Sequence, residues 1–175
     1  MRTWLTIRVE LLSGGGTDLW PYPGRIFAVG PSHTFEDLAQ AIDQAFARWD
    51  IAPMHAFTLA DDRRIDDPED SDYDGPEPLD IRSAKVTRTV RPGDAFCYVF
   101  DFGDDWTHRC TVDDEKLDPH DAFGARLPTR PTPIGGWGSM PDQYGRRWAD
   151  DDGTTDPPAR PAKPDPMTTG IWPEV

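Results

Sequence analysis

The segment from Ala95 to Val112 constrains the fold most, because it alternates along its length as a β-hairpin does. Aromatic side chains recur at every second position before the turn, and a second alternating set follows Asp105. The first set comprises Phe96, Tyr98, Phe100 and Phe102, and the second comprises Trp106, His108, Cys110 and Val112. Gly103 can adopt the positive φ that a tight turn needs. The sequence therefore predicts a hairpin over residues 95–112.

A two-residue loop at Gly103 and Asp104 sets the register of this hairpin. The resulting pairs are Asp101 with Trp106, Val99 with His108 and Cys97 with Cys110. A three-residue loop shifts the register and exchanges the faces, so both alternatives stay open. Large apolar groups occupy both faces, which predicts a central strand pair covered on two sides.

Three other segments have the pattern of strands, and one has that of a helix. Thr3–Leu11 alternates between apolar and polar residues, Arg25–Val29 could pair with it, and His55–Ala60 is a third candidate. From Ser32 to Asp50, Thr34 and Asp37 resemble a capping box, and apolar residues then recur at helical spacing. We expect an α+β fold in a single domain. It has a mixed or antiparallel sheet and one main helix, about residues 35–49, packed across the sheet and ended by Pro53.

The segment Asp61–Asp80 differs in kind, because ten of its twenty residues are acidic. Such a composition predicts a solvated loop. A divalent-cation site is the functional alternative, but the segment lacks the ordered alternation and sixth-position glycine of an EF-hand loop. The following segment, Ala84–Val90, fits either a strand or a short helix.

After Val112 the chain becomes polar and then rich in proline and glycine. Leu127–Gly138 has the composition of an irregular segment, yet the aromatic residues from Trp137 to Trp148 are too apolar to remain in water. We expect an irregular arm packed on the globular body, within one domain of residues 1–149. Residues 150–175 are rich in proline, and we expect most of them to be mobile.

Charge and composition exclude several classes of function. The formal net charge of the 175 residues is −14, which disfavours nonspecific binding to nucleic acid. No apolar run approaches the ~20 residues of a membrane span, and the N-terminus lacks a signal-peptide pattern. We therefore expect a cytoplasmic protein, with its two cysteines as buried thiols. Gly14–Gly16 lacks the lysine of a phosphate-binding loop, and no cofactor is predicted.

The hairpin sequence YVFDFGDDWTH resembles the signature of the plasmid Ri open-reading-frame-three-like domain family, bacterial proteins without an established biochemical role. The early strand, the RIFAV strand with the helix after it, the HAFTL strand and the arm GGWGSMPDQYGRRW extend the resemblance over roughly Thr3 to Trp148. It implies a compact α+β domain. Some relatives carry a label of association with resolvases or transposases, but the basic surface that such enzymes need is absent here.

One candidate site lies at the hairpin turn and consists of Asp101, Asp104, Asp105 and His108. Carboxylates and an imidazole can bind a divalent metal, and the predicted register puts Asp101 and His108 on one face. The alternative is structural, because an Asp before a turn commonly accepts backbone N–H groups of the loop. A metal-dependent enzyme that uses Asp101 and His108 is therefore the competing hypothesis rather than the favoured one.

The favoured hypothesis is a noncatalytic domain that binds a protein or small-molecule partner. Trp, Tyr and Arg dominate the energetically important positions of interfaces. The candidate binding residues are the hairpin acids with Trp106, His108, Trp137, Tyr144 and Arg146. The alternative is that the aromatic residues only fasten the arm to the body.

Overall fold

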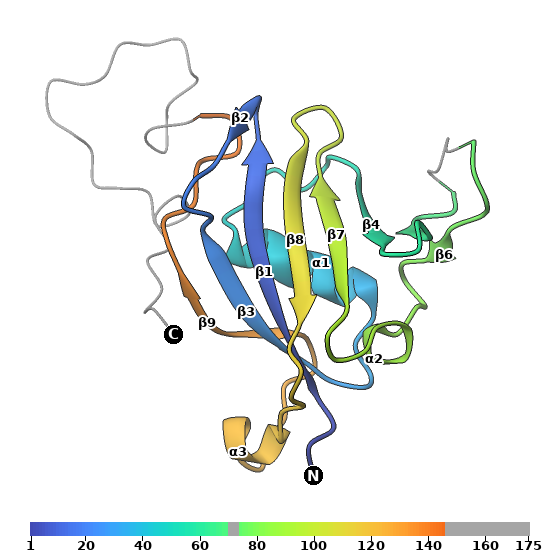
Figure 1. Ribbon diagram of the computed structural model, residues 1–175, viewed down its shortest axis with the longest axis vertical. Coiled ribbons are helices and arrows are strands. Elements are labelled where there is room, and N and C mark those ends of the chain that lie inside the picture. The colour runs from blue at the N-terminus through green and yellow to red at the C-terminus, as the bar shows by residue number, and fades with distance from the viewer. Residues whose placement is uncertain (70–73, 146–175) are drawn as a thin grey trace, which may run out of the picture.

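The computed structural model describes residues 1–69 and 74–145, and within them the strands form one mixed sheet of nine (Figure 1). The order is β6-β5-β4-β7-β8-β1-β3-β9, and β2 pairs with β1. All pairings are antiparallel except that of β5 with β6. The strands are β1 (Leu5–Gly14), β2 (Thr17–Asp18), β3 (Gly24–Val29), β4 (His55–Leu59), β5 (Arg64–Asp66), β6 (Leu79–Asp80), β7 (Ala95–Phe100), β8 (Trp106–Val112) and β9 (Thr132–Trp137). The predicted α+β fold with a central hairpin is confirmed.

The main helix, α1 (Phe35–Ala45), lies across one face of the sheet (Figure 1). The predicted capping box is present, since Thr34 accepts a hydrogen bond from the Asp37 amide and Asp37 accepts one from the Thr34 amide. The helix ends four residues before the predicted Trp49. Ala47 has a φ of 57°, and the amides of Ala47 and Arg48 donate to the carbonyls of Gln44 and Asp43. This Schellman arrangement ends the helix well before Pro53.

The central hairpin is present, but its predicted register is wrong by one residue. Phe100 pairs with Trp106, Tyr98 with His108, Phe96 with Cys110 and Cys97 with Arg109. The loop spans five residues, 101–105, and Asp101 and Asp105 take positive φ values of 60° and 55°. The carboxyl-rich turn, rather than Gly103, therefore supplies the left-handed residues. Cys97 and Cys110 are both free thiols and do not oppose each other.

The register decides which face of the hairpin is buried. Phe96, Tyr98 and Phe100 lie on the same face as Trp106, His108 and Cys110, and all six are buried under α1. The opposite face carries half-buried residues such as Val99 and Thr107, together with the exposed Arg109. In the described part of the chain no helix covers that face (Figure 1). The prediction of a hairpin covered on both sides is therefore wrong.

Three irregular or undecided segments contain regular structure. The acidic segment Asp61–Asp80 includes β5 and β6, and Ile65 within it is fully buried. The undecided segment contains α2 (Val86–Thr89), and a further short helix, α3 (Pro119–Phe123), follows β8. The segment predicted to be irregular contains β9, which pairs with β3 through a register shift beside Pro133. Proline is tolerated there because β9 is an edge strand.

Two predictions concern the remainder of the chain. The mobile tail predicted at residues 150–175 lies outside the described residues. No helix among the described residues is long and apolar enough to cross a membrane.

Candidate functional site

The main polar constellation lies in a cleft between α1 and β4. Two adjoining cavities, of about 390 Å³ and about 300 Å³, share Glu36, Ile51 and His55 in their walls. The first also reaches Asp43 and Arg48, and the second reaches Met54, Asp66, Asp67 and Arg82. Four elements of the chain therefore meet here: α1, the 46–54 connection, β4 and the region around β5.

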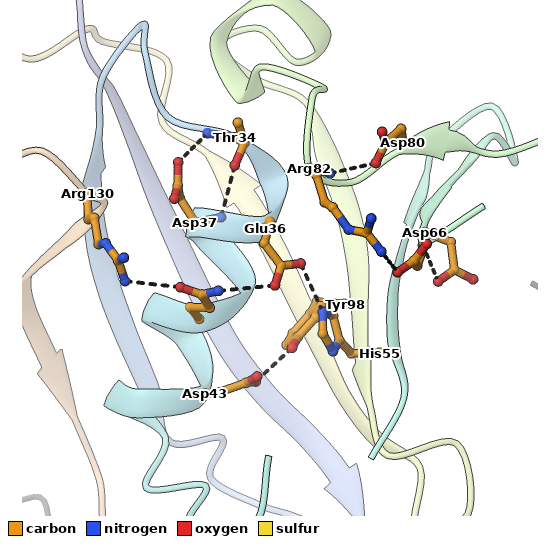
Figure 2. Close-up of polar contacts among 12 residues, drawn as sticks. Thr34, Glu36, Asp37, Asp43, His55, Asp66, Asp80, Arg82, Tyr98 and Arg130 are labelled. Carbon is orange, nitrogen blue, oxygen red and sulfur yellow. Dashed lines mark hydrogen bonds and ion pairs between the residues drawn. The ribbon is translucent and has the colours of Figure 1, made fainter. Parts of the chain in front are cut away.

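Asp43 forms the floor of this cleft, which we call the α1–β4 cleft. The side chain of Asp43 lies on the border of the helix stripe that packs on the sheet, and the residue is only 7% exposed. The hydroxyl of Tyr98, on β7, donates a 2.7 Å hydrogen bond to Asp43 Oδ1 (Figure 2). Burial raises the pKa of Asp43 to about 7, although the Tyr98 hydrogen bond opposes the shift. At neutral pH this carboxyl is therefore divided between its protonated and ionised forms.

Glu36 and His55 form the second pair of the cleft. His55 Nε2 lies 3.5 Å from Glu36 Oε2 (Figure 2). Burial alone lowers the pKa of His55, but the hydrogen bond to Glu36 and the negative charges of Asp43 and Asp66 outweigh it, so the pKa is raised. The hydrogen bond from His55 lowers the pKa of Glu36 against the effect of burial. The other carboxylate oxygen of Glu36 accepts from Gln40, whose carbonyl accepts from Arg130.

The acids at the β5 end of the cleft are each paired with an arginine. Arg64 Nη2 lies 2.8 Å from Asp66 Oδ2. Arg82, labelled in Figure 2, pairs with Asp67. The rim on the other side is apolar. Ile51 is 74% exposed and Met54 is 47% exposed, and both line the cleft. The cleft therefore combines an acidic floor with an apolar rim, which suits a ligand that has both characters.

Of the residues predicted for the hairpin site, Asp101 serves the turn. Its Oδ1 accepts hydrogen bonds from the amides of Gly103, at 3.0 Å, and Asp104, at 3.2 Å. The Asp105 side chain accepts from the hydroxyl of Thr107. The amide of Asp101 donates to the carbonyl of Met54, which fixes the turn against the rim of the α1–β4 cleft. These contacts match the structural alternative for the turn acids.

His108 lies away from those acids, in the interior beneath α1, whereas the buried Trp106 lies near Asp104. His108 Nδ1 lies 3.1 Å from the Tyr98 carbonyl oxygen, and the ring packs edge-on against Phe46. Burial, followed by the positive charge of Arg48, lowers the pKa of His108 to about 3. The Arg48 guanidinium lies 4.5 Å from the centre of the Trp106 ring. The expectation that His108 and Asp101 share a face is wrong, because the true register assigns His108 to the Tyr98 face.

Three of the predicted residues meet at a different cavity. Asp104, Trp106 and Tyr144 line a space of about 470 Å³ with Gly14 and Gln143. Gly145 on its rim is the last residue of the described segment. Because the residues after Gly145 lie outside the described part of the chain, no ligand is proposed for this cavity. The predicted Arg146 lies outside the described residues.

The predicted arm packs on the body through specific contacts. The side chain of Gln143 accepts from the amides of Trp49 and Asp50 and donates to the Asp50 carbonyl. Tyr144 is 46% exposed, and its hydroxyl donates to Asp50 Oδ2. Trp137 lies on the open face of the sheet, apart from the hairpin acids, and its Nε1 donates to the Tyr22 carbonyl. These aromatic residues therefore do not converge on one pocket.

The residues of the α1–β4 cleft were not predicted from the sequence. Each has an ordinary role in its own segment: Glu36 lies in the acidic first turn of α1, Asp43 lies further along the same helix, and Tyr98 belongs to the alternating aromatic residues of the hairpin. One signal was available: Asp43 is flanked at helical spacing by Ala39 and Phe46, which makes it an acid at the edge of the apolar stripe. Among the described residues, no group of three or more His, Cys, Asp or Glu side chains could hold a metal ion.

Comparison with known proteins supplies a family and a fold. A family model described as plasmid pRiA4b ORF-3-like protein matches residues 5–142. A search of curated proteins gave no significant match. Among solved structures, the chain is similar to a protein of unknown function from Methanosarcina mazei Go1, with 19% sequence identity and a TM-score of 0.56. That similarity covers 79% of this chain and 71% of the other, and it extends to the fold alone.

Proposed function

The chain belongs to the plasmid pRiA4b ORF-3-like protein family, and from that premise we propose that it is a noncatalytic binding domain whose ligand occupies the α1–β4 cleft. The observation that carries this proposal is the pair of adjoining cavities, about 390 Å³ and about 300 Å³, around Glu36, Asp43 and His55. Their combined size suits a small molecule or one side chain of a partner.

The chemistry of the cleft supports binding more than catalysis. Its ionisable groups are held by protein partners, with Glu36 against His55 and Asp43 against Tyr98. The residues that line the two cavities include no serine, threonine or cysteine that could act as a nucleophile. The cleft instead offers fixed acceptors beside exposed apolar side chains, which is the character of a recognition site.

A metal-dependent enzyme built on Asp101 and His108 is the alternative function. The geometry does not favour it. Asp101 Oδ1 accepts from two amides of the turn, and His108 is buried on the Tyr98 face with its Nδ1 against the Tyr98 carbonyl. A metal ligand would have to leave either the turn or the interior.

We place this activity in the cytoplasm, with a protein or small molecule as the partner. The two free thiols, Cys97 and Cys110, support a reducing compartment. The net charge of −14 weighs against nonspecific contact with nucleic acid.

The proposal can be tested by screening a library of small fragments against the ¹⁵N-labelled full chain by NMR. We expect amide shifts to cluster around Glu36, Asp43 and His55. The variant Gln44→Trp places a bulky side chain at an exposed position in the cavity wall and should abolish those shifts. The variant Ala122→Trp, on the exposed side of α3, is the matched control and should leave them intact. Fragments that cluster elsewhere, or shifts that survive Gln44→Trp, would contradict the proposal.

A further inference from the structure

We infer that the α1–β4 cleft binds a cationic nitrogen on an aliphatic stem, an alkyl ammonium or guanidinium group, with the positive charge beside Asp43. This inference rests on the proposed function and names the class of ligand. It follows from the one carboxylate of the cleft that has no ion-pair partner.

The other acids of the cleft already have positive partners. Asp66 pairs with Arg64, Asp67 pairs with Arg82, and Glu36 lies against His55. Asp43 is more deeply buried than Glu36, yet its hydrogen-bond partner is the neutral hydroxyl of Tyr98. No salt bridge involves Asp43 within the part of the chain that the structure describes.

Arg48 influences Asp43 through its charge, but two of its three guanidinium nitrogens are hydrogen-bonded elsewhere. Arg48 lies in the wall of the same cavity, but its Nε donates to the Phe46 carbonyl and its Nη2 donates to the Pro141 carbonyl. The guanidinium also stacks on Trp106. Arg48 thus binds the arm to the end of α1 and leaves the carboxylate without a salt bridge.

A buried carboxylate that faces an open cavity is stabilised in its charged form by any cation that enters. Burial raises the pKa of Asp43 to about 7, although the Tyr98 hydrogen bond and the charges of His55 and Arg48 oppose the shift. The cavity has room for such a group, at about 390 Å³, and Asp43 is part of its wall. A bound ammonium or guanidinium can form the direct ion pair that neither His55 nor Arg48 makes with Asp43 among the described contacts.

The aliphatic stem follows from the rim. Ile51 lines both cavities and leaves 74% of its surface in solvent. Methylene groups that extend outward from a cation at Asp43 can cover this side chain and remove apolar surface from water. A free alkylamine or alkylguanidine and a lysine or arginine side chain of a partner protein share this chemistry.

The test uses four butyl probes of similar size against the full chain: n-butylguanidinium, n-butylammonium, neutral n-butanol and n-butylsulfonate. Affinities are measured by NMR titration at pH 8. The cations should bind at least about tenfold more tightly than the neutral and anionic probes. A capped Gly-Arg-Gly peptide identifies the source of the cation. Binding at least as tight as that of n-butylguanidinium points to a protein side chain, and exclusion of the peptide points to a free small molecule.

Variants and pH connect the preference to Asp43. Asp43→Asn keeps an acceptor for Tyr98 and should abolish the preference for cations, whereas Asp121→Asn removes an exposed charge on α3 and should not. Glu36, His55, Tyr98, Arg48 and Asp66 also influence the charge at this position. Because Asp43 gains a proton as the pH falls through about 7, cation affinity should fall about tenfold from pH 8 to pH 6.

Two results overturn the inference. Equal affinity for the neutral and cationic probes refutes the ligand class and leaves the binding cleft in place. A cation preference that survives Asp43→Asn refutes the role of Asp43. If no probe of any charge shifts the amides of the cleft, the proposed function fails together with the inference.

Discussion

Replacing Asp43 with asparagine should change how the stability of the fold depends on pH. The pKa of Asp43 rises from 3.8 to about 7 on folding because the carboxyl is buried. The folded state therefore favours the neutral acid. The stability that this preference gives to the fold is fully present below about pH 4 and is lost as the pH rises through 7. About three pKa units correspond to roughly 4 kcal/mol of unfolding free energy. This is the destabilisation that the wild-type chain should carry above pH 7.

Asparagine has no proton to lose, and its carbonyl can still accept the hydrogen bond from Tyr98. We expect the two proteins to have similar unfolding free energies at pH 4, and the variant to be more stable by several kcal/mol at pH 8. Urea denaturation of both full chains at pH 4, 6 and 8, followed by circular dichroism, measures this difference. Asp121→Asn, at an exposed position of α3, controls for the loss of one charge.

A difference between Asp43→Asn and wild type that stays constant across this range would mean that the pKa of Asp43 does not change on folding. A difference that shifts in favour of the wild type as the pH rises would mean that folding lowers this pKa, as a cation partner within the protein would do. Either result contradicts the raised pKa.

Substitutions at three other positions test the local structure around the cleft, each by urea denaturation at pH 7. Ala47→Gly should stabilise the fold by about 0.5–1 kcal/mol, because Ala47 has a φ of 57° and glycine adopts this conformation without strain. A loss of stability would contradict the Schellman ending of α1. Gln143→Ala removes three hydrogen bonds to the 49–50 backbone and should cost roughly 1–3 kcal/mol, whereas an effect near zero would mean that the arm is not held there. Asp101→Ala should lower the free energy of unfolding by about 1–3 kcal/mol. Asp101→Asn should lower it much less, because asparagine, unlike alanine, keeps an acceptor for the turn amides and tolerates positive φ. Adding Zn²⁺ should leave both differences unchanged.

The elements that depend on short stretches of sequence could be predicted. The alternation of the hairpin, the capping box at Thr34 and the pairing of the first two long strands all follow from neighbours in the chain. The hairpin register could not be predicted, because it depends on the loop length. That length depends on the positive φ values of Asp101 and Asp105, whereas the sequence favours Gly103 as the residue with positive φ.

The end of α1 and the edge strand β9 were missed for related reasons. Alanine at position 47 gives no sequence signal of a helix end, since glycine is the usual residue there. The prolines around β9 indicate irregular chain, and only the place of β9 at the sheet edge makes Pro133 compatible with a strand.

The candidate site depends on contacts between distant parts of the chain. Asp43, His55 and Tyr98 come from a helix and two strands, and each has an ordinary role in its own segment. Their relation exists only once α1 packs across β4 and β7 (Figure 2). The hairpin acids, by contrast, form a cluster that is visible in the sequence. Their role lies within the turn, where two residues are left-handed and Asp101 accepts from backbone amides.

The ¹³Cγ chemical shift of Asp43 as a function of pH reports whether the cleft holds a buried carboxylate that no salt bridge keeps ionised. We expect a midpoint near pH 7 in the free protein, moved to lower pH by saturating n-butylguanidinium. A midpoint near pH 4 in the free protein, or one that the cation does not move, would contradict this expectation.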